Sequence, residues 1–318
     1  MATIFQTAQW REIIMDIYGY EISRLDDVTA FIVRRAYIQR KVTNMPFNFY
    51  PDISAEEARA TICRFTDYCR TAPGTQAEIK LLQPLIADSL VENLGWSVGQ
   101  PFILSQFDLL SDVEETYAAC SKNLIKNIRR IRNKIAKEGI CIEQAESSVD
   151  VDMFFDLLLK VYRDRHQMPC HPPKLYRKLF QTDVAKYYLA RCERQVVGGV
   201  VIIPDDSVWH YCWGATQPEF LQQGVSMALI DKAICGAITA GARTFDFGTS
   251  SPYDSELLEF KRRWGCKFSP AYHYYYPAAS KLAAVDYHES YQLIRKVYKH
   301  IPTSLLKRML PFVVPHFG

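Results

Sequence analysis

The sequence lacks the features that place a protein inside a membrane or outside the cell. None of its windows approaches the roughly 20 uninterrupted apolar residues of a membrane-spanning helix. The first residues carry no charged segment and no long apolar run, so we expect no signal peptide. The nine cysteines are scattered singly from Cys63 to Cys266 without a Cys-x-x-Cys pair, which is typical of reduced thiols. We therefore expect a cytoplasmic protein without a disulfide framework.

The chain also has little net charge and no short repeat. Its formal charge of +3 is too small to indicate nucleic acid binding by itself. A chain of 318 residues with 48% apolar and 23% charged residues is typical of a globular protein with one large domain or two domains. His166, Cys170 and His171 are close in sequence, but a loop rich in proline explains them as well as a metal site does. We expect no metal cofactor.

Residues 1–110 are predicted to form an α/β half. Apolar and polar residues alternate at 13–17 and 30–38, which favours strands. Ser54-Ala55-Glu56-Glu57 is a capping box that opens a helix ending near Arg70. Strands at 78–82 and 102–110 follow.

Residues 111–280 are predicted to form a second α/β half, and 281–318 a basic and apolar tail. A capping box at 111–114 opens a helix that restarts at Ser121. The helices and strands that we expect after it are at 140–145, 149–165, 174–180, 187–192, 196–203, 208–215, 225–240 and 271–276. Strict alternation in the strand 208–215 puts His210, Cys212 and Gly214 on one face.

The helix that ends at Lys137 is strongly basic. It holds Lys122, Lys126, Arg129, Arg130, Arg132, Lys134 and Lys137 and no acidic residue. A solvated face explains this pattern. The alternative is a surface for phosphate, in a nucleotide, an RNA backbone or a lipid-linked diphosphate, with Arg129 and Arg130 as substrate-binding candidates.

A carboxylate and a lysine frame the next notable stretch. Phe245-Asp246-Phe247-Gly248 reads as a short buried strand, in which Asp246 is costly unless it is paired. Ser251 is predicted to cap a helix that ends near Arg263. Lys261 falls on the inward side of that helix, three and four residues after two leucines. A separate helix start after Gly224 presents backbone N–H groups that suit a pyrophosphate.

Two segments resemble the GNAT acyltransferase fold, and more closely its FemAB-like branch. They are Gly241-Ala242-Arg243-Thr244-Phe245-Asp246-Phe247-Gly248 and Phe260-Lys261-Arg262-Arg263-Trp264-Gly265-Cys266-Lys267. The resemblance implies two GNAT-like halves with mixed, mostly antiparallel sheets flanked by helices, and an acyl-donor cleft in the C-terminal half. The branch contains peptidoglycan bridge-forming transferases and acyltransferases of exopolysaccharide synthesis, and the tail, interrupted by prolines, looks like the latter.

The resemblance also implies an acyl donor and its binding loop. GNAT enzymes hold the pyrophosphate of acyl-CoA with a loop of the form Gln/Arg-x-x-Gly-x-Gly/Ala. The matching positions run from Leu221 to Ser226, so the glycine is kept but the first polar and last small residues are replaced. The donor implied is acetyl-CoA or another acyl-CoA, or aminoacyl-tRNA, which some FemAB-like members use. The cofactor-binding candidates are Gln222, Gln223, Gly224, Val225 and Ser226.

Acyl transfer to an amine needs a base, donors for the oxyanion and positive charge near the donor phosphates. His210 is a candidate base, or a structural histidine. Asp246 is a candidate base or binds the substrate amine, unless it partners an arginine or loop amides. FemAB-like enzymes place a functional lysine in the Phe-Lys motif, which implies a catalytic role for Lys261. Tyr253 is a further substrate-binding candidate.

Three functions are compatible with this sequence. The first is transfer of an acyl group, most simply acetyl, to an amino or hydroxyl group of a sugar or cell-envelope precursor. The second is an aminoacyl transferase that uses aminoacyl-tRNA, with the basic helix on the RNA. The third is a non-catalytic binding module. The basic tail either packs on the body or contacts an acidic membrane surface at the inner face of the membrane.

Overall fold

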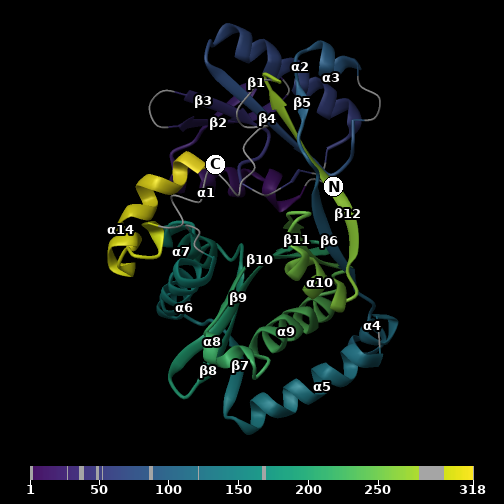
Figure 1. Cartoon of the computed structure of the whole chain (residues 1–318), viewed down its shortest axis with the longest axis vertical. Helices are drawn as coiled ribbons and strands as arrows, with labels where there is room; N and C mark the ends of the chain where they lie inside the picture. Colours follow the sequence, from purple (N-terminus) through teal and green to yellow (C-terminus); the bar gives the residue numbers. More distant parts are fainter. Residues whose placement is uncertain are drawn as a thin grey trace. The chain divides into compact units, whose positions relative to one another are not determined.

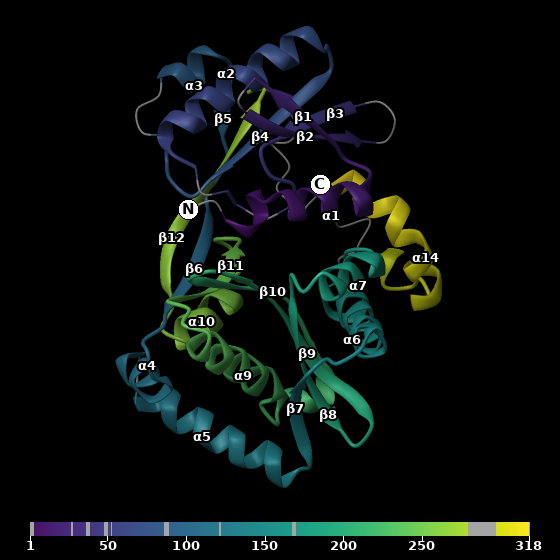
Figure 2. The same ribbon diagram turned by 180° about the vertical axis from the view of Figure 1, so that it is seen from behind.

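The computed structural model describes residues 3–26, 28–35, 39–47, 50–51, 53–85, 89–120, 122–166, 170–278 and 297–317. The chain forms two compact units, and Figures 1 and 2 show its ribbon from opposite sides. Unit 1 comprises Met1–Ile103, Pro270–His300 and Arg308–Gly318, and unit 2 comprises Leu104–Ser269 and Ile301–Lys307.

Unit 1 is built on a mostly antiparallel sheet in the order β1-β2-β3-β4-β12, with β5 also paired to β12. The bounds are β1 (Glu21–Leu25), β2 (Val28–Arg35), β3 (Gln39–Thr43), β4 (Thr75–Leu81), β5 (Ser97–Val98) and β12 (Lys267–Tyr276). Helix α2 (Ala55–Thr71) packs its Ile62 and Phe65 on Ala77 and Ile79 of the sheet. The predicted Ser54 capping box is present, because Ser54 and Glu57 each accept the backbone N–H of the other. Helices α1 (Ala8–Tyr18) and α3 (Ser89–Asn93) complete the unit.

The strand predicted at 13–17 is wrong, because these residues lie within helix α1. Thr7 caps this helix by accepting the N–H of Trp10, and Gly19 follows its last residue. Trp10, Ile13, Ile14, Ile17 and Tyr18 are buried, at the three- and four-residue spacing of one helix face. A window of five residues contained too little of this period to show it. The strand predicted at 30–38 is β2, and its last three residues lie outside the described ranges.

Unit 2 has a sheet in the order β6-β11-β10-β9-β8-β7. Its strands are β6 (Phe102–Asp108), β7 (Ile140–Gln144), β8 (Lys186–Cys192), β9 (Gln195–Asp205), β10 (Val208–Thr216) and β11 (Thr244–Ser250). Its helices are α4 (Val113–Cys120), α5 (Lys122–Lys137), α6 (Ser148–Val161), α7 (Pro173–Gln181), α8 (Pro218–Leu221), α9 (Val225–Thr239) and α10 (Ser255–Arg263). These bounds confirm most of the predicted elements, whereas Asp112 and not Ser111 caps α4, by accepting two backbone N–H groups.

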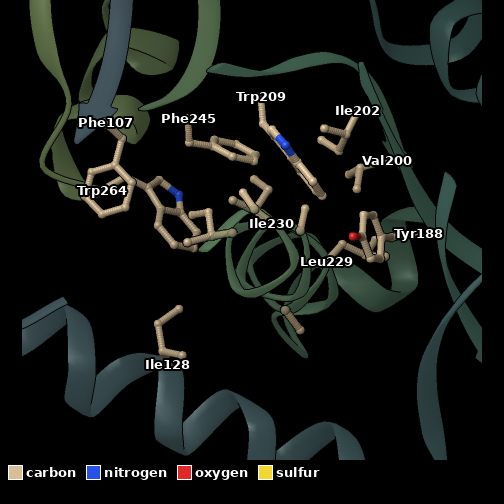
Figure 3. Packing of buried hydrophobic residues seen from close by; sticks show 14 of the residues in the cluster. Phe107, Ile128, Tyr188, Val200, Ile202, Trp209, Leu229, Ile230, Phe245 and Trp264 are labelled. Carbon is tan, nitrogen blue, oxygen red and sulfur yellow. The ribbon is translucent and has the colours of Figure 1, made fainter. Parts of the chain in front are cut away.

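The core of unit 2 lies between the sheet and helices α9 and α5, while α6 and α7 lie on the other face of the sheet (Figure 1). Figure 3 shows Trp209 and Phe245 of the sheet facing Leu229 and Ile230 of α9. Each fully buried side chain of this size contributes about 1.5–3 kcal/mol. Arg132 of α5 adds a bidentate ion pair with the buried Asp231 of α9, at 2.7 Å for both contacts. The core therefore fixes the helix that leads away from the Gly224 loop.

Helix α14 (Thr303–Val313) lies in the described part of the predicted tail, residues 297–317. Lys307 pairs with Asp156 of α6 at 2.7 Å and lies over the ring of Phe155. Within the ranges given above, no helix has both the length and the apolar character needed to cross a bilayer. The predicted fold class, α/β with mostly antiparallel sheets flanked by helices, is confirmed.

Candidate active site

Strands β10 and β11 open away from each other after a short parallel pairing. The register joins Val208 to Thr244, Trp209 to Phe245 and His210 to Asp246. Beyond His210 and Asp246, β10 continues to Thr216 and β11 to Ser250 without further mutual pairs in this fully described stretch. Two unpaired strand edges therefore flank the position where the pairing ends.

A β-bulge between Tyr211 and Trp213 changes which residues face this opening. His210 pairs with Ile203 and Trp213 with Val201, so His210 shares its sheet face with Trp213. The prediction that Gly214 lies on the face of His210 is wrong, because Cys212 is the extra residue of the bulge and the alternation is inverted beyond it. The Cys212 thiol donates to the carbonyl of His210 at 3.6 Å. Gly214 lies instead beside Tyr211: a Cβ atom at Gly214 would stand 2.0 Å from the Tyr211 hydroxyl.

The three predicted catalytic residues meet where the pairing ends. The Nδ1 atom of His210 lies 3.1 Å from Oδ2 of Asp246. Oδ1 of Asp246 accepts the backbone N–H of Gly248 at 2.7 Å, and Lys261 Nζ donates to the carbonyl of Gly248 at 2.9 Å. A second carboxylate, Asp205, lies 3.8 Å from His210 Nε2. Sequence reasoning missed Asp205, because it looked like an ordinary turn residue; the structure places it at the end of β9, paired with Val208 of β10.

Burial and charge set the protonation of this group in opposite directions. Burial opposes a charge on His210, but Asp205 and Asp246 outweigh it and raise the His210 pKa to about 9. Burial lowers the pKa of Lys261 to about 8, and the nearby Asp246 limits the fall. Near neutral pH His210 is therefore an imidazolium. The pKa of Lys261 is close to the working pH, as the pKa of a group that transfers protons should be.

Helix α10 carries Lys261 inward as predicted, with 3% of the residue exposed. The predicted capping residue is wrong: Asp254 caps α10 by accepting the N–H of Leu257 at 3.0 Å. Ser251 instead accepts the N–H of Tyr253 in the preceding turn. Tyr253 is 65% exposed at this turn.

The predicted donor loop forms the uncapped N-terminus of α9. Gly224 precedes the helix with φ of 87°, and no side chain caps it. A Cβ atom at Gly224 would lie 2.9 Å from Ile131 of α5, so the loop depends on glycine for both its backbone conformation and its packing. Ser226 donates to Thr216 Oγ1 at 2.9 Å, and Lys134 donates to the carbonyl of Gln222 at 3.1 Å.

A cavity of about 180 Å³ lies beside this loop. Tyr211, Gly214 and Thr216 of β10 line one part of it, and Leu221 and Ser226 of the loop line another. Val161 at the end of α6 and Arg165 in the turn that follows line a further part. The cavity thus adjoins the bulged strand and the N-terminus of α9.

Residues 122–262 match the family model described as an acetyltransferase (GNAT) domain. This part of the chain is therefore similar to a GNAT acetyltransferase domain, and residues 122–262 are called the GNAT-like domain below. A search of the curated proteins finds no match. The bulged β10, the opening toward β11 and the glycine before α9 all lie within this GNAT-like domain.

Solved structures resemble the chain over nearly its full length. FemX has a TM-score of 0.63 and 13% identity, and the match covers 92% of this chain and 94% of FemX. L-PGS from Bacillus licheniformis has a TM-score of 0.61 and 11% identity, covering 92% and 96%. The C-terminal domain of a protein described as a lysylphosphatidylglycerol synthetase from Agrobacterium fabrum has a TM-score of 0.61 and 13% identity, covering 89% and 95%. At identities this low, the likeness is one of fold alone. It covers about nine tenths of this chain and so includes residues of both units.

Four of the seven basic residues of α5, namely Arg129, Arg130, Arg132 and Lys134, have side-chain or backbone partners within unit 2. Arg129 pairs with Glu114, and Arg130 donates to Asn127 at 2.8 Å. Neither arginine lines the cavity. Lys126 and Lys137 are exposed, and the side chain of Lys122 lies outside the described part of the chain. Across the described ranges, no cluster of His, Cys, Asp and Glu side chains has the arrangement of a metal site.

Proposed function

We propose that the chain transfers an acyl group, most simply acetyl from acetyl-CoA, to an amino or hydroxyl group of a sugar or cell-envelope precursor such as an exopolysaccharide unit. The observation that carries this proposal is the end of the β10–β11 pairing. There a buried lysine, a histidine and a carboxylate meet, in the same domain as a helix N-terminus beside a cavity. In this proposal 1–110 and 111–280 are the two GNAT-like halves, and 281–318 is the tail.

The donor is proposed to bind at the loop before α9. The first N–H groups of a helix have no partner within it, and the helix dipole adds partial positive charge at that end. Both features favour a pyrophosphate, and Gly224 leaves the backbone open to it. Gln222, Gln223, Val225 and Ser226 are the remaining residues of this proposed subsite.

Lys261 is the proposed catalytic residue for the transfer. An ammonium group has three N–H donors, and the carbonyl of Gly248 takes one of them. The others can stabilise the oxyanion that forms when the acceptor attacks the acyl carbon. When this intermediate collapses, the bond from the acyl carbon to the CoA sulfur breaks, and the lowered pKa lets Lys261 protonate the departing thiolate, while the acceptor loses its proton to solvent, from which Lys261 is protonated again. Imidazolium His210 supports the developing negative charge, and Asp246 orients it. Tyr253 is proposed to contact the acceptor.

The second candidate function is aminoacyl transfer from aminoacyl-tRNA. The exposed Lys126 and Lys137 on α5 favour it, because a basic helix face binds a phosphate backbone. Arg129 and Arg130 belong to the same proposed surface, and each can exchange its present partner for phosphate. The third candidate, a non-catalytic module, would retain the fold without binding either donor.

Calorimetric titration with acetyl-CoA separates the three functions. Binding that is accompanied by acetyl transfer to an amine supports the first function, and absence of heat at millimolar ligand contradicts it. Binding of charged tRNA in moderate salt, without acetyl-CoA binding, supports the second. Absence of both supports the non-catalytic module.

The tail is proposed to contact an acidic membrane surface from the cytoplasmic side. On α14, Leu305, Met309 and Phe312 are exposed at four- and three-residue spacing, and the exposed Arg308 lies between them. Such a face inserts into the headgroup region of a bilayer and gains from anionic lipid. Sedimentation with phosphatidylglycerol vesicles tests this: Phe312→Ser should reduce binding, and equal binding to phosphatidylcholine vesicles would contradict the role of charge.

A further inference from the structure

One cationic side chain in the wall of the 180 Å³ cavity has no role in the function described so far. Arg165 belongs to a π-helical turn, Tyr162–His166, that directly follows α6. A π turn is wider than an α turn and is frequently found at functional sites. Val161, before the turn, and Arg165, within it, both line the cavity. The turn therefore brings this arginine to the cavity.

The surroundings of Arg165 differ from those of the neighbouring arginines. Arg163 pairs with Asp164 at 2.6 Å, and Arg177 forms a bidentate pair with Asp152. The described residues provide neither an ion-pair nor a hydrogen-bond partner for Arg165. The other lining residues in the described ranges are apolar or carry hydroxyl groups, so no carboxylate of the wall neutralises the guanidinium.

The part of the cavity lined by Leu221 and Ser226 lacks a strong side-chain donor. Leu221 offers no polar group, and the Ser226 hydroxyl already donates to Thr216. What this side offers is the backbone N–H groups at the start of α9. A guanidinium and a helix N-terminus at one cavity together provide positive potential and a fork of N–H groups, which match a phosphate.

We propose that Arg165 binds a phosphate group of the acyl donor, supplying the side-chain contact that Leu221 does not make. This inference rests on the proposed acyl transfer and deepens it. Acyl-CoA carries a pyrophosphate at the other end of its pantetheine arm from the thioester, and the acylated end of a tRNA carries phosphodiesters, so either can provide the group. The acyl part of the donor then extends along β10 toward His210 and Lys261.

The test compares donors with and without phosphate. We expect Arg165→Gln to weaken CoA binding about tenfold to a hundredfold, the range for losing a charge-assisted hydrogen bond. Binding of S-acetylpantetheine, which has no phosphate, should not change. Arg165→Lys should lie between, because lysine keeps the charge and loses the fork. Lys160→Gln, an exposed substitution on α6, is the control and should bind CoA as the unchanged protein does.

The outcomes separate this inference from the proposed function. CoA binding that is unaffected by Arg165→Gln overturns the role of Arg165 and leaves acyl transfer standing. If the unchanged protein binds charged tRNA and not CoA, the same comparison is made with charged tRNA, where a weakened Arg165→Gln variant supports the inference. If the unchanged protein binds neither donor, both proposals fail. A lowered melting temperature of Arg165→Gln together with weaker S-acetylpantetheine binding would assign Arg165 a structural role instead.

Discussion

The two units each bury a cluster of charged residues around a histidine, and the two clusters differ in their ratio of acid to base. In unit 1, the carboxylate of Glu78 lies 2.9 Å from the Lys41 nitrogen, 3.7 Å from the Lys80 nitrogen and 3.1 Å from His273 Nδ1. In unit 2, two carboxylates, those of Asp205 and Asp246, lie beside the ring nitrogens of His210. In the first arrangement the histidine shares one carboxylate with two lysines, whereas in the second the histidine has two carboxylates beside it.

This ratio reverses the protonation of the two histidines. Burial lowers the pKa of His273, and its single shared carboxylate does not compensate. The two carboxylates beside His210 outweigh burial and raise its pKa to about 9. A neutral histidine in unit 1 can link Tyr50 and Glu78 across strands, whereas a charged one in unit 2 provides a positive centre at the end of the β10–β11 pairing. Burial alone therefore does not decide which of the two histidines carries charge.

Glu78→Gln should have the largest effect on stability. It leaves Lys41 and Lys80, each 3% exposed, without their carboxylate, and breaking a buried ion pair costs about 3–5 kcal/mol. Urea denaturation should show this loss. Glu114→Gln, which removes the exposed partner of Arg129, is the control, with an expected loss below about 1 kcal/mol. Equal losses in the two variants would show that the unit 1 cluster is not a structural requirement.

Lys261→Ala should have the next largest effect, on rate. Removing an oxyanion donor typically lowers kcat by about 10²–10³, and we expect a loss in this range in acetyl transfer assays. The circular dichroism spectrum should stay unchanged. Arg262→Ala is the matched control, because Arg262 is one residue away, exposed and paired with Glu259. Unchanged turnover in Lys261→Ala would rule out its catalytic role.

His210 should make stability depend on pH in the direction opposite to His273. The folded pKa of His210 is raised from 6.5 to about 9, so its contribution is complete below pH 6.5 and is lost as the pH rises through 9. The full change is at most about 3 kcal/mol. His273, with a lowered pKa, destabilises the fold only as the pH falls below 6.5.

The measurement is the difference in unfolding free energy between the unchanged protein and His210→Gln from pH 6 to 9.5. The difference is needed because Lys261 also contributes to the pH dependence. Its pKa is lowered from 10.5 to about 8, so its contribution raises the free energy of unfolding as the pH rises over part of this range. A difference that does not vary with pH would show that the two carboxylates fail to hold a charge on His210.

Tyr50→Phe should have the smallest effect. The Tyr50 hydroxyl lies 2.6 Å from His273 Nε2, and losing one buried hydrogen bond costs about 1 kcal/mol. The same urea experiment measures it. A loss as large as that of Glu78→Gln would mean that the Tyr50 hydroxyl stabilises the unit 1 cluster as much as the Glu78 carboxylate does. That result would contradict the central role given to Glu78.

The sequence predicted those parts of the fold and site that depend on local pattern. The capping box of Ser54 and Glu57 predicted the start of α2. The position of Lys261 after two leucines correctly predicted that its side chain is buried. Asp246 was recognised because a carboxylate between two phenylalanines needs a partner. In each case, residues within one helical turn or one strand carry the information.

The parts that were missed depend on contacts distant in sequence or on irregular backbone. No pattern marks Cys212 as the extra residue of a bulge, yet the bulge decides which side chains share the face of His210. Asp205 ends a strand and Arg165 lies in a π-helical turn, and the residues around both have an ordinary composition. The cluster of Lys41, Glu78 and His273 joins three strands, and the first of them, β3, is not among the predicted strands.

Gly248 gives the site a property that neither charged neighbour has alone. Asp246 holds the N–H before its Cα atom and Lys261 holds the carbonyl after it, so groups of opposite charge restrain its φ and ψ rotations respectively. Strand β11 and helix α10 are thereby connected through the backbone of one residue, so a displacement of the helix would also move the carboxylate that contacts His210. The exchange rate of the Gly248 amide proton would measure how often its hydrogen bond to Asp246 opens.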